Sequence, residues 1–294
     1  MIQNNTCNEI AKNYSIIIMS CDPYSDVWDS MTETFDRFWP HCPFEVYLCS
    51  ENKKFEHTWI KNIRTEKRMG WGEMLDFVLK KVNTPYVIYM QEDYLLKSSI
   101  NNDQVFTWLT FFESTRAAYL RMLPWPNPDL LFENRTDVGL ISEKDPFRTS
   151  LQCAVWDKCV LQKLVKVDES GWDFEANSGA RTQGMNRPFL SLKAEVDYAT
   201  MNDLTYPIDY FATGVLHGKW MREAIFYFRK IGVNIDPGKR GVITRWDYWY
   251  RHQCKNEAFK EKFFLKMLNR VFNSVVGKSI HNSYIIFRAK LKSS

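Results

Sequence analysis

Short apolar runs alternate with segments of helical periodicity along the first half of the chain. The runs at 14–20, 44–49 and 86–90 are too short for helices and are bounded by turn residues, so they predict strands, with a further short strand at 60–64. Between them, apolar side chains recur at helical spacing and predict helices over about 25–39, with Ser25 as the cap, and over 73–82. This alternation is typical of βαβ units. The sequence therefore predicts an α/β fold with a mixed, mainly parallel sheet flanked by helices.

The second half of the chain is less regular. The pattern predicts the following elements in order: a helix over about 103–113, a strand at 118–122, a proline-rich loop at 124–128, hairpin or extended structure over 129–150, an edge strand followed by a helix within 150–164, an irregular polar stretch over 176–210, and a last segment over 211–245. The chain has no internal repeat and no convincing linker. We therefore expect one catalytic domain over 1–250, followed by an extension over 251–294.

Composition narrows the class of protein. With 294 residues and 45% hydrophobic content, the chain can bury a sizeable core, and its 11 Trp, 14 Tyr and 20 Phe suit either stacking on sugar rings and nucleobases or an ordinary aromatic core. Seven cysteines without CxxC spacing indicate neither a disulfide framework nor a zinc site. The apolar run at 15–19 is too short for a signal sequence or a membrane span. We therefore expect a protein of the reducing cytoplasm.

The positive charge is concentrated at the C-terminus. The net charge is +4, but residues 255–294 carry nine Lys and Arg against two acidic residues, a net +7, which leaves −3 for residues 1–254. Aromatic and aliphatic residues over 263–272 interrupt the basic ones, so the extension resembles an amphipathic helix on an anionic membrane surface; a terminal helix packed on its own domain is an equal alternative. The first reading predicts a peripheral protein on the cytoplasmic face of the inner membrane. The acidic remainder excludes nucleic acid as a partner.

Two adjacent acids, Glu92 and Asp93, directly follow the buried strand at 86–90. In open α/β sheets ligands bind beyond the carboxyl ends of the strands, which is where this pair falls. One or two carboxylates there can hold Mg²⁺ or Mn²⁺, which neutralises the charge that develops on a leaving diphosphate. A solvated strand end is the alternative interpretation of the same residues.

The sequence from Tyr86 to Tyr94, YVIYMQEDY, resembles the strand and acidic motif of GT-A glycosyltransferases, particularly bacterial enzymes that assemble surface polysaccharides such as O-antigen or capsule. The resemblance covers roughly residues 14–220 in element order and implies a GT-A-like fold with a nucleotide-sugar donor. It implies that Asp93 binds a divalent metal and that Gln91 and Glu92 contact the donor. Gln91 stands where the family usually has an acid. Because an amide adds no charge, either Glu92 compensates or dependence on the metal is weak.

A second acidic cluster, ESGWDFE at 169–175, offers the carboxylate base that an inverting sugar transfer requires. If a helix begins at Asp173, then Asp173 and Glu175 point to different faces and only one can meet the acceptor. The resemblance to the Glu-Asp base motif of inverting GT-A enzymes leads us to favour Glu175 over Asp173 by a narrow margin. Trp172 is expected to stack on the acceptor sugar or to anchor the helix, and Trp125 in the proline-rich loop is a second acceptor candidate.

The resemblance extends to the rest of the donor site. In HGKW at 217–220, His217 would complete the metal shell and Lys219 would meet the diphosphate, with Arg240 and Arg245 as alternatives to Lys219; a surface turn explains the same tetrapeptide. The remaining donor candidates lie in the loop after the first strand and in the loop before residue 73: Ser20, Asp22, Tyr24 and Arg68. A helix-capping turn accounts equally well for the first three of them.

Three functions remain open at this point. The leading hypothesis is inverting transfer of a sugar from a nucleotide-diphosphate donor to an oligosaccharide or a polyprenyl-diphosphate-linked acceptor. A non-catalytic carbohydrate-binding protein on the same fold is the alternative. A metal-dependent phosphoesterase is disfavoured, because the five histidines lack metal-binding spacing.

Overall fold

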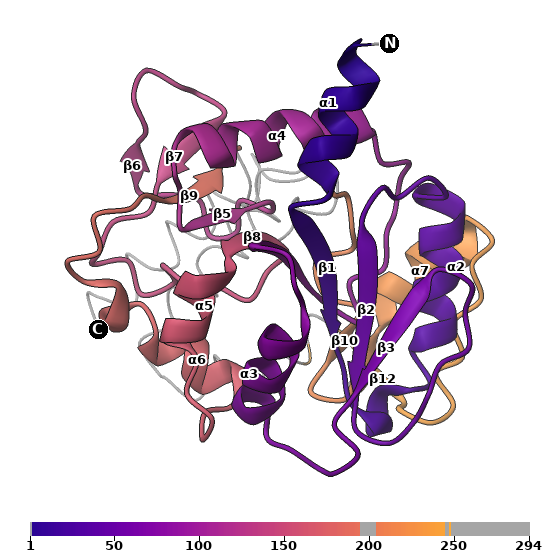
Figure 1. The fold of residues 1–294 in the computed structure, drawn as a ribbon. Helices are drawn as coiled ribbons and strands as arrows, with labels where there is room; N and C mark the ends of the chain where they lie inside the picture. Colours follow the sequence, from indigo (N-terminus) through magenta and orange to yellow (C-terminus); the bar gives the residue numbers. More distant parts are fainter. Residues whose placement is uncertain (1, 195–203, 245–246, 248–294) are drawn as a thin grey trace, which may run out of the picture.

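The computed structural model describes residues 2–194, 204–244 and 247. A nine-stranded sheet in the order β3-β2-β1-β4-β8-β5-β9-β7-β6 runs through the molecule, and a three-stranded sheet, β10-β11-β12, lies beside it (Figure 1). The expected α/β fold with a mixed sheet flanked by helices is therefore confirmed. The predicted extension at 251–294 lies outside the described residues.

The first four strands form the parallel half of the large sheet. The elements of this half are α1 (Ile2–Ala11), β1 (Tyr14–Met19), α2 (Trp28–Phe38), β2 (Glu45–Ser50), β3 (Ile60–Arg64), α3 (Trp71–Lys81) and β4 (Tyr86–Gln91). Strands β2 and β4 both pair in parallel with β1, so their carboxyl ends meet at one edge of the sheet. The first helix turn differs from the prediction. Ser25 closes a short 3₁₀ turn at Asp22–Tyr24, and α2 begins after Val27 without a side-chain cap.

The second half of the sheet mixes directions. Its elements are α4 (Asn102–Ser114), β5 (Tyr119–Arg121), β6 (Leu130–Leu131), β7 (Val138–Leu140), β8 (Ala154–Asp157), α5 (Lys158–Leu164), α6 (Gly171–Asn177), a 3₁₀ turn at Ala180–Thr182 and β9 (Phe189–Leu192). Strand β8 runs antiparallel between β4 and β5, so the predicted edge strand is wrong: its residues are almost wholly buried. The polar stretch at 176–210 likewise contains a fully buried strand, β9, where we expected irregular structure. The expected hairpin within 129–150 is present as β6 and β7.

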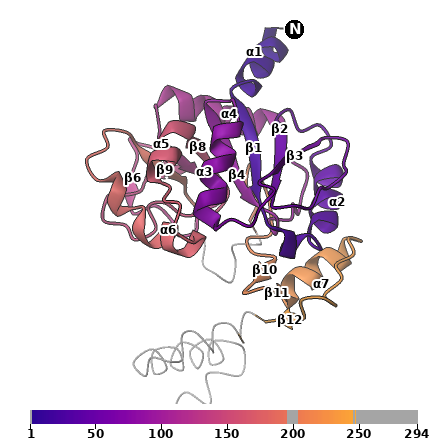
Figure 2. The ribbon, with the colours of Figure 1, turned by 60° about the horizontal axis from the view of Figure 1, so that its bottom comes forward.

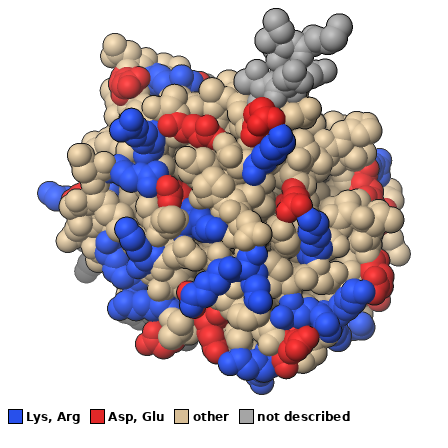
Figure 3. Space-filling model, in the orientation of Figure 1, with Lys and Arg blue, Asp and Glu red and all other residues tan. Residues whose placement is uncertain are grey.

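Two layers of side chains cover the sheet. Successive residues of β1 point to opposite faces. Ile16 and Ile18 pack with α2, α4 and α7, whereas Ile17 and Met19 pack with α3, α5 and α6. The latter three helices stand in front of the sheet in Figure 1. On this face basic and acidic side chains are interspersed (Figure 3), and some form surface pairs such as Lys67–Glu73 and Lys80–Asp76.

Residues 214–244 form a small unit below the large sheet (Figure 2). It contains β10 (Val215–Leu216), β11 (Lys219–Met221), α7 (Arg222–Lys230) and β12 (Val242–Ile243). The unit is fixed to the main sheet by polar contacts: Tyr227 Oη donates to the Lys97 carbonyl at 3.0 Å and Val215 N donates to Asp93 at 3.0 Å. These contacts bring the unit against the segment that follows β4.

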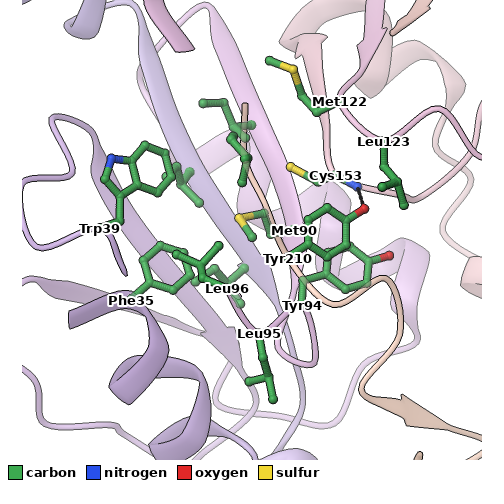
Figure 4. Close-up of a cluster of buried hydrophobic side chains, with 14 of the residues drawn as sticks. Phe35, Trp39, Met90, Tyr94, Leu95, Leu96, Met122, Leu123, Cys153 and Tyr210 are labelled. Atoms are coloured by element: carbon green, nitrogen blue, oxygen red, sulfur yellow. Dashed lines mark hydrogen bonds between the residues drawn. The ribbon is translucent and has the colours of Figure 1, made fainter. Parts of the chain in front are cut away.

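Stacked tyrosines join that segment to the chain that leads into the small unit. Tyr94 and Tyr210 stack with ring centroids 4.6 Å apart, and the backbone N–H of Cys153 donates to Tyr210 Oη at 3.1 Å (Figure 4). Tyr210 Oη in turn donates to Gln152 at 2.6 Å. Three segments distant in sequence are thus fixed around the end of β4.

Candidate functional site

A cavity of about 520 Å³ lies where β1 and β4 end. The proline-rich loop, the segment before β8, helix α6 and strand β10 supply most of its other walls. Eight residues singled out in the sequence line it: Tyr24, Gln91, Glu92, Asp93, Trp125, Trp172, Glu175 and His217. The cavity lies beyond the carboxyl end of a strand in the parallel half of the sheet, which is where open α/β sheets bind ligands.

The acid pair occupies the buried side of this cavity. Glu92 is 8% and Asp93 5% exposed, because β4 is enclosed on both faces and delivers them directly from the core. Burial raises the pKa of Asp93 to about 6, although its Oδ2 accepts a hydrogen bond from Val215 N. Burial and the neighbouring Asp93 raise the pKa of Glu92 well above its usual value. Within the described part of the chain no Lys or Arg forms an ion pair with either carboxyl group.

The carboxylates of the cavity suit a hard cation whose remaining ligands are supplied by the phosphates of the substrate. No group of three or more His, Cys, Asp or Glu able to hold a metal occurs among residues 2–194, 204–244 and 247. Mg²⁺ is commonly held by only one or two carboxylates together with substrate phosphates, so Glu92 and Asp93 fit this mode of binding. His217 lines the same cavity, and its ring stacks on Trp172 with centroids 6.1 Å apart. The Gln91 amide donates to Tyr89 Oη at 3.3 Å.

Helix α6 brings Glu175 into the cavity and keeps Asp173 out of it. Ser170 caps the helix, and the Asp173 carboxylate closes a capping box with the Ser170 backbone N–H. Asp173 is therefore exposed and committed to the helix end, so of the two candidate bases only Glu175 lines the cavity. Oε1 of Glu175 accepts from Leu151 N at 2.6 Å and Ser150 Oγ at 3.1 Å. Burial raises its pKa.

Aromatic side chains form much of the remaining wall. Trp172 is 65% exposed and Phe147 49%, so both present rings at the mouth of the cavity. Trp71 lines the interior, where its Nε1 donates to Tyr89 Oη at 3.3 Å and its ring packs on Phe174. Flat apolar faces of this kind suit sugar rings. Trp125 and Trp172 were expected here from the sequence, whereas Phe147 was not, because a single aromatic residue in a loop carries no local signal.

Four predicted donor residues lie outside this cavity lining. Ser20 Oγ accepts from Trp28 Nε1 at 2.8 Å, inside the core. The Asp22 carboxylate accepts from the backbone N–H groups of Asn52 and Lys53 and so fixes the loop after β2, whereas neither the 3₁₀ turn at Asp22–Tyr24 nor α2 has a side-chain cap. Arg68 and Lys219 are exposed.

Other residues of the site were not accessible to sequence reasoning. Gln152 lines the cavity from the segment before β8, Thr213 from the residue that precedes the small unit, and Leu216 from β10. Each is a common residue type whose role depends on a contact far along the chain. Arg240, considered above for the diphosphate, instead pairs with Asp26 at 2.6 and 2.9 Å; Arg245 lies outside the described residues.

Comparisons with known proteins find distant structural likeness. No protein-family model and no curated protein matches the chain. Residues 1–349 of S. aureus TarS are 12% identical, with a TM-score of 0.44 over 78% of this chain and 68% of that one. The 4-diphosphocytidyl-2C-methyl-D-erythritol synthase of Anaerococcus prevotii DSM 20548 is 11% identical, with a TM-score of 0.39 over 77% and 99% of the two chains. The bifunctional IspDF of Campylobacter jejuni is 15% identical, with a TM-score of 0.36 over 66% of this chain and 55% of that one.

These scores are too low to bear on activity, which is therefore inferred from the cavity itself. Among the helices of the described segments, none combines the length and the apolar character needed to cross a bilayer.

Proposed function

We propose that this chain is a glycosyltransferase that moves a sugar from a nucleotide-diphosphate donor to a glycan acceptor. One observation carries the proposal. A single cavity at the carboxyl end of β4 holds a buried acid pair, Glu92 and Asp93, together with a third, half-buried carboxyl group, Glu175, on a separate helix. The two sets of acids support two different tasks within one reaction.

The acid pair is suited to the donor. Glu92 and Asp93 would hold the divalent cation, Mn²⁺ or Mg²⁺, and that ion would offset the negative charge on the leaving nucleoside diphosphate. The hydrogen bond from Val215 N orients the Asp93 carboxylate, and the Tyr89 hydroxyl orients the Gln91 amide toward the donor. Tyr24 supplies a ring on this side of the cavity.

Glu175 is suited to the acceptor. Its raised pKa places a carboxylate of increased basicity in the cavity, and the bonds from Leu151 N and Ser150 Oγ fix its orientation. We assign to Glu175 the role of the base that takes the proton from the attacking acceptor hydroxyl. Attack on the sugar from the face opposite the leaving diphosphate then inverts the configuration at the sugar carbon. The exposed Trp172 ring, with Trp125 and His217 nearby in the cavity wall, would hold the acceptor glycan. A lipid-linked acceptor, used in surface-glycan assembly at the cytoplasmic face of the inner membrane, agrees with the basic extension.

The alternative is a carbohydrate-binding protein without catalysis, which the aromatic wall favours. Glu175 distinguishes the two functions, because burying a carboxyl group of raised pKa is costly and a binding wall does not require it. A glycan binder would bind oligosaccharide without nucleotide.

The test is release of nucleoside diphosphate from a panel of nucleotide sugars, with acceptor glycans and either Mn²⁺ or a chelator. We expect turnover by the wild type and its loss in Asp93→Asn and Glu175→Gln. Asp137→Asn is the control, because this carboxylate pairs with Arg135 away from the cavity. Unchanged turnover in both cavity variants would refute the proposal. Glycan binding without any nucleotide binding would establish the alternative.

A further inference from the structure

Arg240 connects the end of the small unit to the loop that follows β1. Its Nε and Nη2 donate to the two carboxylate oxygens of Asp26 at 2.9 and 2.6 Å, and Nη2 also donates to the Pro23 carbonyl at 2.6 Å. The side chains of Arg240 and Asp26 are only 8% and 13% exposed, so this bidentate pair is largely shielded from water. Shielded, bidentate contacts are the stronger kind of ion pair. We call this set of contacts the Arg240 clasp.

The clasp also fixes the position of an aromatic ring. The Arg240 guanidinium lies 4.0 Å from the centroid of the Tyr24 ring, close enough for a strong cation–π contact. Tyr24 lines the cavity, whereas neither Asp26 nor Arg240 does. The Tyr24 ring therefore contacts the guanidinium and also borders the space that a substrate would occupy.

The use of the guanidinium donors argues against bidentate binding of a diphosphate. Arg has five N–H donors; its two Nη atoms can grip a carboxylate or phosphate, and so can the edge formed by Nε and one Nη. In Arg240 the edge formed by Nε and Nη2 is filled by Asp26, and Nη2 also donates to the Pro23 carbonyl. A phosphate could therefore form a bidentate contact only by displacing one of these acceptors, and otherwise it could accept from Nη1 alone.

We infer that Arg240 is a positioning residue for the donor: with Asp26 it holds Tyr24 as a fixed wall against which the nucleotide end of the donor stacks. This inference rests on the proposed function. It assigns the nucleotide end to the Tyr24 side of the cavity and the acceptor to the Trp172 side. It also makes Asp26, which touches no substrate, a determinant of donor affinity.

A double-mutant cycle with Asp26→Asn and Arg240→Met tests the inference, with binding of UDP, GDP and CDP in Mn²⁺ and steady-state turnover as readouts. Each single variant should weaken binding of the nucleoside diphosphate that the wild type binds most tightly and should raise the donor KM, each by roughly tenfold, with kcat nearly unchanged. The double variant should be no worse than the worse single variant, since both changes open one clasp. Arg240→Lys retains the cation over Tyr24 but not the fork, so it should restore part of the affinity.

Arg135→Met is the matched control. Arg135 also forms a bidentate pair, with Asp137 at 2.9 and 2.6 Å, and lies 4.7 Å from the Phe111 ring centroid, but none of these residues lines the cavity. The donor KM of Arg135→Met should equal that of the wild type.

Three results would overturn the inference. If kcat falls in Arg240→Met while Asp26→Asn binds normally, Arg240 acts on the diphosphate itself. If both variants bind like the wild type, the clasp has no role while the proposed function stands. If the wild type binds no nucleoside diphosphate, the proposed function fails as well. Should Arg240→Met not fold, Asp26→Asn with its thermal midpoint and KM decides alone.

Discussion

Replacing Glu175 with Gln separates the catalytic role of this residue from its structural one. Gln has nearly the same shape and keeps a side-chain oxygen that can accept from Leu151 N and Ser150 Oγ. It has no basic carboxylate. The change thus removes the proposed base while retaining the local packing of α6 against the segment before β8.

The expected magnitudes follow from the environment of the carboxyl group. A general base contributes about 10²–10⁴ in rate, which is about 3–5 kcal/mol of activation free energy. Stability should change in the other direction. Because the pKa of Glu175 is raised in the folded state, the stability that its neutral form provides is lost as pH rises above the ordinary value of 4.5. Gln mimics the neutral form at every pH, so Glu175→Gln should be at least as stable as the wild type at pH 7.5. Glu175→Ala leaves Leu151 N unpaired and should cost about 1–3 kcal/mol.

The assay combines initial rates of nucleoside diphosphate release, the Kd for nucleoside diphosphate and thermal unfolding, all at pH 7.5. We expect Glu175→Gln to bind the product normally, to unfold no earlier than the wild type and to release product at most about a hundredth as fast. In the wild type, the rate should fall as pH drops through the raised pKa, since the base must be ionised. A Gln variant that keeps more than about a tenth of the wild-type rate would show that Glu175 is not the base.

Three further predictions concern other walls of the cavity. Without divalent cations, Asp93→Asn should be more stable than the wild type by about 1–3 kcal/mol at pH 7.5 and no more stable below pH 3.8. The reason is that folding raises the pKa of Asp93 from 3.8 to about 6, which costs the wild type stability as pH rises through that window. Mn²⁺ should raise the melting temperature of the wild type but not that of Asp93→Asn. Gly214→Ala would place a Cβ 2.7 Å from the Asp93 carbonyl oxygen. It should lower the free energy of unfolding by about 1–3 kcal/mol and weaken Mn²⁺ binding. The control is Gly179→Ala, whose Cβ would have its nearest neighbour at 3.6 Å and should change neither quantity. Trp172→Ala should raise the acceptor KM roughly tenfold with little effect on the melting temperature. The control is Phe226→Ala, because Phe226 is 66% exposed on α7, and this variant should leave the acceptor KM unchanged. Equal KM values in the two variants would show that Trp172 is not part of the acceptor site.

Strands with a strong local signal were predictable, whereas strands defined by distant partners were not. The runs that became β1, β2 and β4 are short, apolar and bounded by turns, so their sequences alone suffice. Strand β9 has only four residues in a polar stretch and is buried because it pairs with β5, some 70 positions earlier. Helix α1 was missed because its polar sequence carries little amphipathic pattern.

The candidate site shows the same division. Glu92 and Asp93 were found because burial on a strand and adjacency are local properties. Asp173 was misleading because Ser-x-x-Asp, a capping box, presents the same acidic residue that a catalytic motif would. The partners of the acids, such as Leu151 and Val215, act through backbone N–H groups, and no side-chain pattern predicts which N–H will face a carboxylate.

The docking of residues 214–244 links the persistence of the cavity to a local event in the molecule. The contact from Val215 to Asp93 spans 122 positions, and the contact from Arg240 to Asp26 spans 214. Parts of a folded protein open as cooperative units, and the free energy of such an opening can lie well below that of global unfolding. If residues 214–244 detach as one such unit, the Asp93 orientation and the Tyr24 wall are lost together while the nine-stranded sheet stays folded. Amide hydrogen exchange at Val215 would then report the lifetime of the competent site, and substitutions at the seam of the unit would reduce activity at temperatures where the chain remains folded.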